Sequence, residues 1–596
     1  MTRRQRRALE SICETFIGNG AVEAGVPDAL LELTPAGDRR PLLALLSMWD
    51  VGGRFSRRSQ AEREAALLRW RDSGIAARRR VFHGLRRGSL IPYYGRVDPE
   101  ARPAAAERRI TPVRLDRDTS CDVCVIGSGA GGGVAAAVLA ESGLEVVVLE
   151  AGAHYEDADF GGRELDAYRR LYLESAAPTT HDGGIGLLAG SCVGGTTVVN
   201  YTTSFRTPDA IREEWGEPFT SPDFDESLAA VERRIGVNTD EGAPSGRDEV
   251  MSRGLERLGW HVAAMPRNTR GCEQGVVCGR CGFGCPIGAK QSTLVTWLVD
   301  AQANGARIVP STPALRLVPG RGVAAANGFV SARAVVVAAG ALNTPALLKR
   351  SGFGNPNIGR HLHLHPTTGV SGVFDEEIRP WEGTLQALYS DQHADLSDGY
   401  GLKYETAPVH PGVLAAFAPW EGATESRELL EQLPHLSGVG VLLRDRSEGE
   451  VRVARDGTPR VRYGFEPFDL AHIRTGIDGA ARIFEAAGAK RIFSSHARLV
   501  SYEPADGVRE RWLRAADAAG YGPGRCTFYS FHLMGSARLG ASPESAATKP
   551  SGETWDAHDV YVMDGSSFPS ASGVNPMLTI EALAHLNARR LAAKLA

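Results

Sequence analysis

The sequence predicts an α/β fold: a discontinuous Rossmann-like domain, a β-sheet domain that binds the substrate, and an N-terminal helical module. Three observations predict it: a strand, glycine turn, helix and strand near residue 120, strand-like alternation over 366–519, and helical periodicity before residue 110. Because single cores stop growing near roughly 250 to 300 residues, a chain of 596 residues should hold several domains. We expect the helical module at 1–110, the Rossmann-like domain at 118–365 and 520–596, and the β-sheet domain at 366–519.

The N-terminal segment shows the apolar spacing of an amphipathic helix. Five residues at i, i+3, i+4, i+7 and i+8 place one apolar stripe on a helix, which we interpret as a packing face: Leu9, Ile12, Cys13, Phe16 and Ile17. Similar patterns over 41–48 and 61–70 predict further helices. The polar, proline-containing stretch 98–114 predicts a linker.

Charge is distributed unevenly along the chain. The formal net charge is -4, but residues 1–120 hold 23 arginines and 15 acidic residues, a net +8, which leaves -12 for the remainder. We interpret the basic segment as a solvated surface that docks on the acidic remainder, and we expect no nucleic-acid partner.

No apolar stretch reaches the roughly 18 residues that a transmembrane helix needs. The arginine-rich N-terminus runs directly into an amphipathic pattern and lacks the apolar region of a signal peptide. We therefore expect a cytoplasmic protein, and peripheral contact with a membrane stays open.

The strand beginning at Cys121 runs directly into a glycine-rich turn. Gly127, Gly129 and Gly132 form a G-x-G-x-x-G pattern before a helix, and Glu150 ends the next strand. In such a unit the first glycine makes a tight turn, the second admits a pyrophosphate and the third allows close packing of helix and strand. The pattern predicts dinucleotide binding, with Glu150 accepting from ribose hydroxyls. We interpret Cys121 and Cys124 in the strand as buried apolar residues.

Later segments add loops and helix starts that suit a flat ligand. The stretch 190–206 contains paired glycines followed by hydroxyl residues, and 333–339 reads as a buried strand with Pro345 at the start of the next helix. Residues 560–563 predict a strand that leads to Asp564. Asn575 and Pro576 open the final helix, whose free N–H groups can stabilise negative charge.

Together these pieces resemble the glucose-methanol-choline family of FAD-dependent oxidoreductases, and within it most closely the long-chain fatty alcohol oxidases. The resemblance covers almost the whole chain. It is carried by the segments VIGSGAGGGVAAAVLAESGLEVVVLEAG, AGSCVGGTTVVNYTTSFRTP, CGRCGFGCPIGAKQSTLVTWLVDA, GALNTPALLKRSG, FHLMGSARLG and DGSSFPSASGVNPMLTIEALA.

The resemblance implies a set of FAD contacts. The diphosphate would lie on the glycines of the turn, the adenosine ribose on Glu150, the ribityl chain on Asp564, and the flavin pyrimidine on the segment from Asn575 to Thr579. The residues implied for the flavin ring and the pyrimidine are Gly194, Gly195, Thr196, Asn200, Pro576 and Met577. Because 194–200 contains no histidine for a covalent link, we expect noncovalent FAD.

Alcohol oxidation needs an acceptor for the hydroxyl proton, since the flavin takes only the hydride. The resemblance places His532 there as the base and Asn575 as its partner, and a histidine suits this role at neutral pH. We expect oxidation of a primary, hydrophobic, long-chain alcohol to the aldehyde, with oxygen or another electron acceptor. Alternatives are a dehydrogenase of sterols, aromatic alcohols or sugars, a non-redox FAD-containing lyase, and a docking subunit.

Two clusters of ligand-type residues leave alternatives open. Among four clustered cysteines, the last three, Cys278, Cys281 and Cys285, resemble part of a bacterial ferredoxin run, whereas the spacing from Cys272 to Cys278 departs from it. An iron–sulfur cluster, zinc, or plain thiols or a local disulfide would each account for them. His361, His363 and His365 alternate in a strand-like run and could line a metal site. We prefer a structural role for these three histidines.

Overall fold

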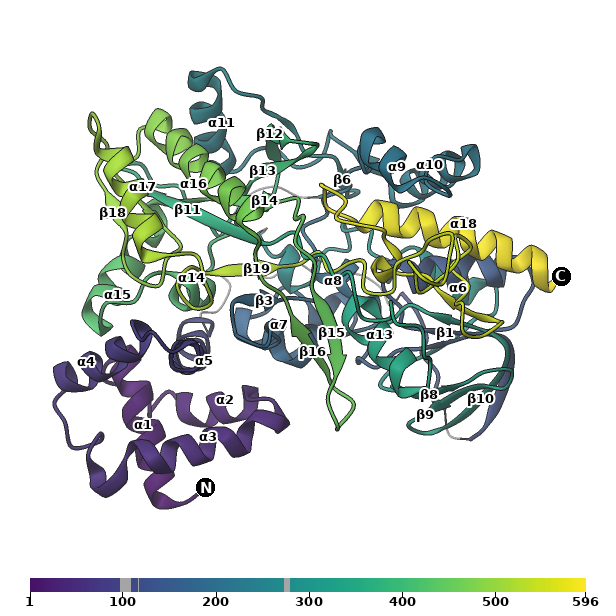
Figure 1. Ribbon diagram of the computed structural model, residues 1–596, viewed down its shortest axis with the longest axis horizontal. Helices are drawn as coiled ribbons and strands as arrows, with labels where there is room; N and C mark the ends of the chain where they lie inside the picture. The colour runs from purple at the N-terminus through teal and green to yellow at the C-terminus, as the bar shows by residue number, and fades with distance from the viewer. Residues whose placement is uncertain (97–108, 116, 273–278) are drawn as a thin grey trace.

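The computed structural model describes residues 1–96, 109–115, 117–272 and 279–596. Figure 1 shows two halves side by side, each built around a sheet, with the purple N-terminal helices against one of them. Most of the predicted linker 98–114 lies outside the described residues. Within the described ranges, no helix has both the length and the apolar character needed to span a membrane.

A seven-stranded sheet forms the first half, and its central strands are parallel. β1 pairs with β2 on one side and with β10 on the other. β20, from near the C-terminus, also pairs in parallel with β10, so the end of the chain completes a sheet begun at residue 119. The order is β7-β2-β1-β10-β9-β8. The strands are β1 (Thr119–Ile126), β2 (Val146–Leu149), β7 (Arg307–Val309), β8 (Ala314–Val318), β9 (Gly322–Ala325), β10 (Gly328–Val337) and β20 (Val560–Val562).

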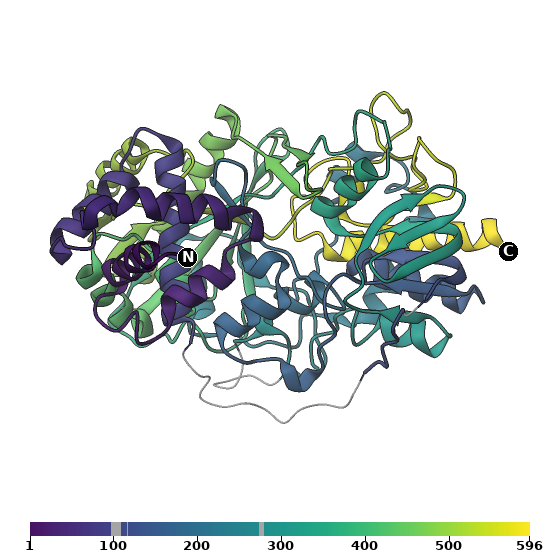
Figure 2. The ribbon, with the colours of Figure 1, turned by 90° about the horizontal axis from the view of Figure 1, so that it is seen from below.

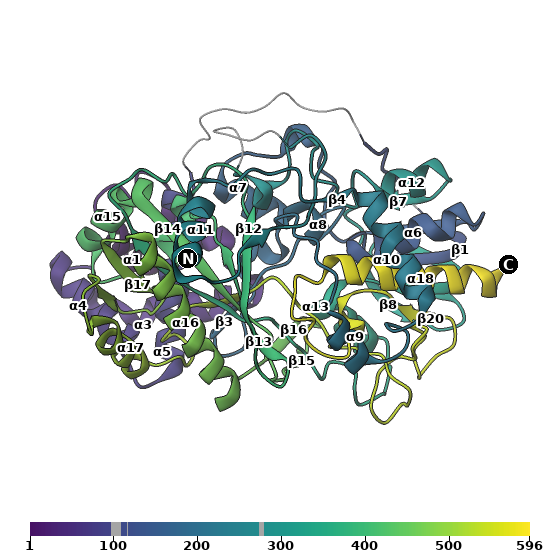
Figure 3. The ribbon, with the colours of Figure 1, turned by 90° about the horizontal axis from the view of Figure 1, so that it is seen from above.

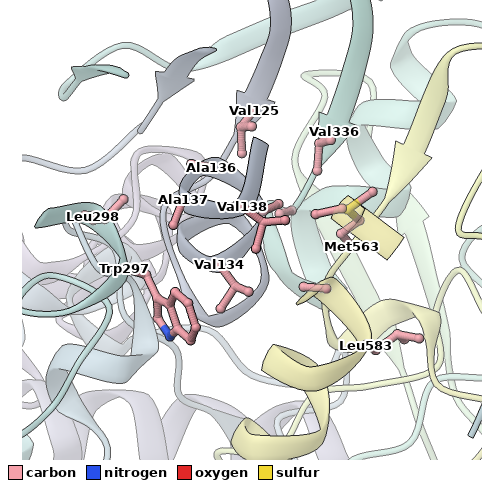
Figure 4. Packing of buried hydrophobic residues seen from close by; sticks show 14 of the residues in the cluster. Val125, Val134, Ala136, Ala137, Val138, Trp297, Leu298, Val336, Met563 and Leu583 are labelled. Carbon is pink, nitrogen blue, oxygen red and sulfur yellow. The ribbon is translucent and has the colours of Figure 1, made fainter. Parts of the chain in front are cut away.

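Helix α6 (Ala130–Glu141) follows the glycine turn and is buried along nearly its whole length. Val125 of β1 and Val336 of β10 lie over it on the sheet side, and Leu583 lies on the α18 side (Figure 4). Alternate β1 residues such as Cys124 pack on the opposite face of the sheet, so both faces are covered. The covering helices are α10 (Pro222–Ile235), α12 (Trp297–Ala303) and α18 (Met577–Leu595) on one face and α13 (Gly340–Arg350) on the other.

Pro345 lies inside α13 and not at its start, because the helix already begins at Gly340. Proline lacks the N–H that would bond to the carbonyl four residues earlier. The Ser536 hydroxyl instead donates to that carbonyl, on Ala341, at 2.6 Å. A side chain from a distant loop thus makes the proline tolerable.

A nine-stranded, mainly antiparallel sheet forms the second half. Its order is β18-β17-β11-β14-β13-β12-β5, with β19 pairing to β11 and β3 pairing to β19. Three strands, β3, β5 and β19, come from outside the expected range 366–519. The strands are β3 (Ile185–Leu187), β5 (Ala263–Ala264), β11 (Thr367–Val373), β12 (Leu388–Ser397), β13 (Tyr400–Thr406), β14 (Leu436–Leu443), β17 (Arg491–Ser494), β18 (Ser501–Tyr502) and β19 (Phe528–Ser530).

Helices within 366–519 were not expected from its strand-like pattern, and four occur there. The longest, α16, covers the sheet together with α11, and Figure 3 shows both in the same half as α17. Gly479 weakens the sequence signal for α16, and packing requires this glycine, because a Cβ there would lie 1.9 Å from the Tyr404 hydroxyl oxygen. Glycine lowers helix propensity but lets the helix approach the sheet. The four helices are α14 (Pro411–Phe417), α15 (Ala423–Glu431), α16 (Pro467–Ala487) and α17 (Val508–Ala519), and α11 (Gly246–Leu258) comes from outside this range.

Five helices form the N-terminal module: α1 (Arg3–Ile17), α2 (Val26–Leu33), α3 (Ala36–Trp49), α4 (Gln60–Arg71) and α5 (Ala76–Tyr94). The predicted apolar stripe of α1 is fully buried. Trp420, from the loop between α14 and α15, inserts into this core with its ring 4.9 Å from Phe16 and 5.9 Å from Phe82. The module is therefore packed on the second half, as Figure 2 also shows.

The remaining α-helices and strands are short. They are α7 (Glu164–Leu171), α8 (Thr196–Val199), α9 (Asp209–Trp215), the pair β4 (Val237–Asn238) and β6 (Arg267–Asn268), and the pair β15 (Glu450–Val453) and β16 (Pro459–Arg462). Several of them border a cavity of about 1640 Å³ that lies between the halves.

Candidate active site

The glycine turn between β1 and α6 packs tightly against its own fold. Gly127 has a φ of 97°, and a Cβ there would lie 2.2 Å from the carbonyl oxygen of Ala338. A Cβ on Gly132 would lie 1.9 Å from the carbonyl oxygen of Gly127. Gly129 differs, since its Cβ would meet only Gly195 Cα, at 3.8 Å, and it borders the cavity. Packing requires Gly127 and Gly132, whereas Gly129 keeps the cavity open.

Glu150, at the end of β2, holds this turn in place. Its Oε2 accepts from the backbone N–H of Ser128 at 3.0 Å and from the Ser128 hydroxyl at 2.6 Å, and Oε1 accepts from Gly152 N–H at 2.8 Å. Burial raises the pKa of Glu150. The backbone N–H of Ala151 acts on the same carboxylate, so protein donors occupy Glu150, and its predicted contact with a ribose hydroxyl stays a prediction.

The second glycine pair touches the first. A Cβ on Gly195 would lie 2.8 Å from Gly129 Cα, and Gly194 lies behind the cavity surface, where its N–H donates to Ser128 Oγ at 3.0 Å. The Thr196 hydroxyl accepts from Gly190 N–H at 3.0 Å. Gly195 and Thr196 border the cavity, and the serine of the first turn therefore fixes the position of the second loop.

Asn200 and the start of α18 form the neighbouring part of the cavity. Asn200 Nδ2 donates to Met577 Sδ at 2.9 Å, and Pro576 and Met577 border the cavity at the first turn of α18. The first N–H groups of a helix have no partner within the helix, so this end of α18 can offer donors to a ligand in the cavity. A positive helix end is thus available beside Asn200.

Asp564, which follows β20, is occupied by protein donors. Its Oδ2 accepts from Gly340 N–H at 2.8 Å and from Thr344 Oγ1 at 2.5 Å, and its Oδ1 accepts from Ser566 N–H at 2.8 Å and from the Ser566 hydroxyl. Burial raises the pKa of Asp564. The carboxylate therefore joins the start of α13 to the end of β20, and its predicted contact with a ribityl chain stays a prediction.

His532 and Asn575 come together at the cavity surface. Asn575 Nδ2 lies 3.4 Å from His532 Nε2, and both residues border the same cavity as Gly129. Burial, with a smaller effect of His365, lowers the pKa of His532 well below its usual value. His532 is therefore neutral near pH 7.

His365 contacts His532 and was not expected to do so, because we preferred a structural role for it. Gly573 N–H donates to His365 Nε2 at 3.0 Å, and His365 Nδ1 lies 3.2 Å from His532 Nδ1. Burial lowers the pKa of His365 to about 4, so it is neutral. Since an amide N–H can only donate, His365 carries its proton on Nδ1 and donates to His532. This arrangement puts the His532 proton on Nε2, whereas the Asn575 amide nitrogen can donate to Nε2 only when that nitrogen is unprotonated, so the two contacts favour opposite tautomers of His532.

The carboxylate of Glu405, on β13, lies behind Asn575 and had no sequence signal beyond a single acid in a strand. Burial raises the pKa of Glu405, while Lys403 and hydrogen bonds from Asn575 and Gln386 act in the opposite direction. Gln386 Nε2 donates to Glu405 Oε2 at 2.9 Å. Asn575 is thus oriented between His532 and a buried carboxylate.

The cysteine segment borders the site through Lys290. This buried ammonium donates to the carbonyls of Val198, Asn200 and Cys281 at 2.6 to 2.7 Å, and Lys290 N–H donates to Cys285 Sγ at 3.4 Å. Burial raises the pKa of Cys285, which favours its thiol form. These contacts hold the chain next to Asn200.

Cys278 lies outside the described residues. In the parts of the chain that the structure describes, no three His, Cys, Asp or Glu side chains gather as a metal-binding group. Cys272, Cys281 and Cys285 are free thiols. The iron–sulfur and zinc hypotheses therefore gain no support from the described residues.

His361 and His363 point to different partners. His361 Nδ1 lies 2.8 Å from Glu448 Oε2, and His363 Nδ1 lies 3.5 Å from Asp445 Oδ2. Asp445 also accepts from the backbone N–H groups of Leu364 and His365 at 2.9 and 3.0 Å. Both histidines precede His365 in the chain, and Asp445 fixes the backbone at His365, the histidine that meets His532.

Comparison with known proteins identifies the chain. Residues 168–367 and 445–584 match the N- and C-terminal models of GMC oxidoreductases. Long-chain-alcohol oxidase FAO4B of Arabidopsis thaliana is 36% identical in an alignment of 503 positions that covers 78% of this chain and 66% of that protein. Long-chain-alcohol oxidase FAO1 of the same plant is 34% identical in an alignment of 523 positions that covers 80% of this chain and 68% of that protein.

The chain belongs to the GMC oxidoreductase family. It matches about two thirds of the length of these plant relatives. A formate oxidase structure from Aspergillus oryzae aligns with a TM-score of 0.60 and 16% identity, covering 80% of this chain and 99% of that one. This likeness confirms the predicted GMC fold.

Membership of the GMC oxidoreductase family implies FAD as the cofactor, and the residues that border the cavity fit it. The cavity reaches the open side of Gly129 and borders Glu150, then passes Thr196 and Asn200 to Met577. The first turn of α6 supplies N–H donors for a diphosphate, and that of α18 supplies donors for an anionic ring. These residues would hold FAD, and noncovalent attachment stays a prediction.

Proposed function

We propose that this GMC oxidoreductase oxidises primary alcohols with a long aliphatic chain to the aldehydes and passes the electrons to oxygen or another acceptor. The observation that carries the proposal is the pair of His532 and Asn575 on a cavity that also reaches the FAD-binding residues. Relatives named long-chain-alcohol oxidases support the substrate class.

FAD, when bound, accepts a hydride from the alcohol carbon. The hydroxyl proton then needs a separate acceptor, and His532 Nε2 is the histidine nitrogen that faces Asn575. Asn575 Nδ2 donates to the alcohol oxygen and keeps it near that nitrogen. The carboxylate of Glu405 next to Asn575 favours this orientation of the amide.

His532 accepts this proton at Nε2 only in the tautomer that carries its own proton on Nδ1. His365 then accepts at Nδ1 and carries its own proton on Nε2. That state loses the hydrogen bond from Gly573, but it leaves Nε2 free to accept from Asn575 Nδ2 or from the alcohol.

Anaerobic reduction of the bound flavin tests the proposal. On mixing with 1-dodecanol, the wild type should lose its flavin absorbance, and His532→Ala should do so about 10² to 10⁴ times more slowly. His361→Ala is the matched control, because His361 pairs with Glu448 away from this cavity. Equal rates in wild type and His532→Ala would reject the base. Unchanged flavin bands with every alcohol tested would reject alcohol oxidation.

A further inference from the structure

The cavity continues past the catalytic pair and reaches the N-terminal helical module. One face of α5 borders it, through Arg80, Gly84, Arg87, Gly88 and Ile91. These positions follow helical spacing, and eleven steps of 1.5 Å give a path of about 16 Å along the helix. The opposite side of this part comes from the module itself and combines the apolar side chains of Leu30, Leu33, Leu42 and Leu45 with the charged side chains of Glu32, Asp38 and Arg39.

A row of aromatic side chains connects α5 to the catalytic pair. The Arg87 guanidinium lies 4.9 Å from the Phe417 ring centre, Phe417 lies 6.1 Å from Tyr529, and Tyr529 lies 5.4 Å from Phe531. Phe531 directly precedes His532, and all of these residues border the same cavity. The path from the reacting end to the module is therefore continuous and largely nonpolar.

Two glycines keep the α5 side of this path open. Gly84 lies in the middle of the helix and borders the cavity, yet a Cβ there would meet no atom within 4 Å. At Gly88 a Cβ would come within 2.8 Å of Leu30 Cγ, so that glycine serves the packing of α2 on α5. Glycine is a poor helix former, and packing gives no reason for it at Gly84. The missing side chain leaves space for a ligand.

Across the cavity, Gly186 of β3 repeats this feature. It also borders the cavity, and a Cβ there would meet atoms only at 3.8 Å or more, including Arg87 Nη1 at 3.9 Å. Positions without side chains therefore occur on both α5 and the second sheet. The absent side chains leave room for an aliphatic chain between α5 and β3.

We propose that the helical module forms the outer part of the alcohol-binding channel, and that the α5 face at Gly84 receives the distal end of an unbranched aliphatic chain. The proposal rests on the function proposed above and extends it, because it assigns recognition of chain length to the module. Each methylene buried there should improve binding about fourfold.

A bulky side chain at Gly84 tests the channel. In Gly84→Trp, the ratio of kcat/KM for 1-dodecanol to that for 1-hexanol should fall about 50-fold, which corresponds to about three methylenes denied burial. Gly74→Trp is the matched control, because Gly74 belongs to the same module, also has no atom within 4 Å of its Cβ position, and does not border the cavity. An unchanged ratio in Gly84→Trp would overturn the proposal.

Equilibrium dialysis of radiolabelled 1-dodecanol gives a readout that does not need turnover. The wild type and Gly74→Trp should bind it, and Gly84→Trp should bind it about 50-fold more weakly. If no alcohol is oxidised but dodecanol binding shows this pattern, the proposed function fails and the channel stands. If the wild type does not bind dodecanol, the channel is rejected. If Gly84→Trp does not fold, Gly186→Leu should narrow the same path from the opposite side.

Discussion

Gly129→Ala should separate binding of FAD from folding of the protein. Gly129 has a φ of -71°, which any residue adopts, and its Cβ would meet only Gly195 Cα at 3.8 Å. The free energy of unfolding of the FAD-free protein should therefore change by less than about 0.5 kcal/mol. The added methyl group would project toward the diphosphate, and overpacking of about 1 to 3 kcal/mol raises the Kd for FAD about 5- to 150-fold.

Gly132→Ala is the contrasting variant, because it adds the same methyl group against the protein itself. Its Cβ would lie 1.9 Å from the carbonyl oxygen of Gly127, so α6 must shift by more than 1 Å to restore ordinary contact. The FAD-free protein should lose about 1 to 3 kcal/mol of stability. Urea unfolding followed by circular dichroism measures stability, and quenching of flavin fluorescence measures the Kd. Equal stability losses in both variants, or wild-type FAD affinity in Gly129→Ala, would refute the reasoning.

Three further predictions concern the histidines and the module. In protein with ¹⁵N-labelled histidine, the nitrogen shifts of His365 should show a proton on Nδ1, because Gly573 N–H donates to Nε2, and a proton on His365 Nε2 would contradict this contact. Burial lowers the pKa of His365 to about 4 and that of His410 to about 3. As the pH falls below 6.5, these histidines take up protons in the unfolded chain before they do so in the folded protein. The free energy of unfolding should therefore fall by about 3 kcal/mol per histidine between pH 6.5 and pH 4, and urea midpoints that do not change over this range would contradict the prediction. Trp420→Ala should lower the free energy of unfolding by about 3 to 5 kcal/mol, because it removes the ring that packs beside Phe16. A thermal unfolding midpoint equal to that of the wild type would contradict this prediction.

Local features of the fold were predictable because neighbours in the chain decide them. The turn at Gly127, the helix after it and the strand ending at Glu150 are contiguous, and their backbone conformations depend on residues a few positions away. The same holds for Pro576 before α18. The long helix α16 was not predicted, because Gly479 lowers the helix propensity of its sequence. The reason for this glycine is the close approach of α16 to Tyr404, which only the tertiary structure shows.

The sequence by itself determined the fold class, the cofactor fingerprint and, through the family resemblance, the candidate residues His532 and Asn575. Only the tertiary structure decided which groups surround them. His365 is 167 residues from His532 in the chain, and the helical module reaches the cavity from the opposite end of the sequence. Such contacts form when separate elements pack together, so the residues involved share no spacing that a sequence pattern could show.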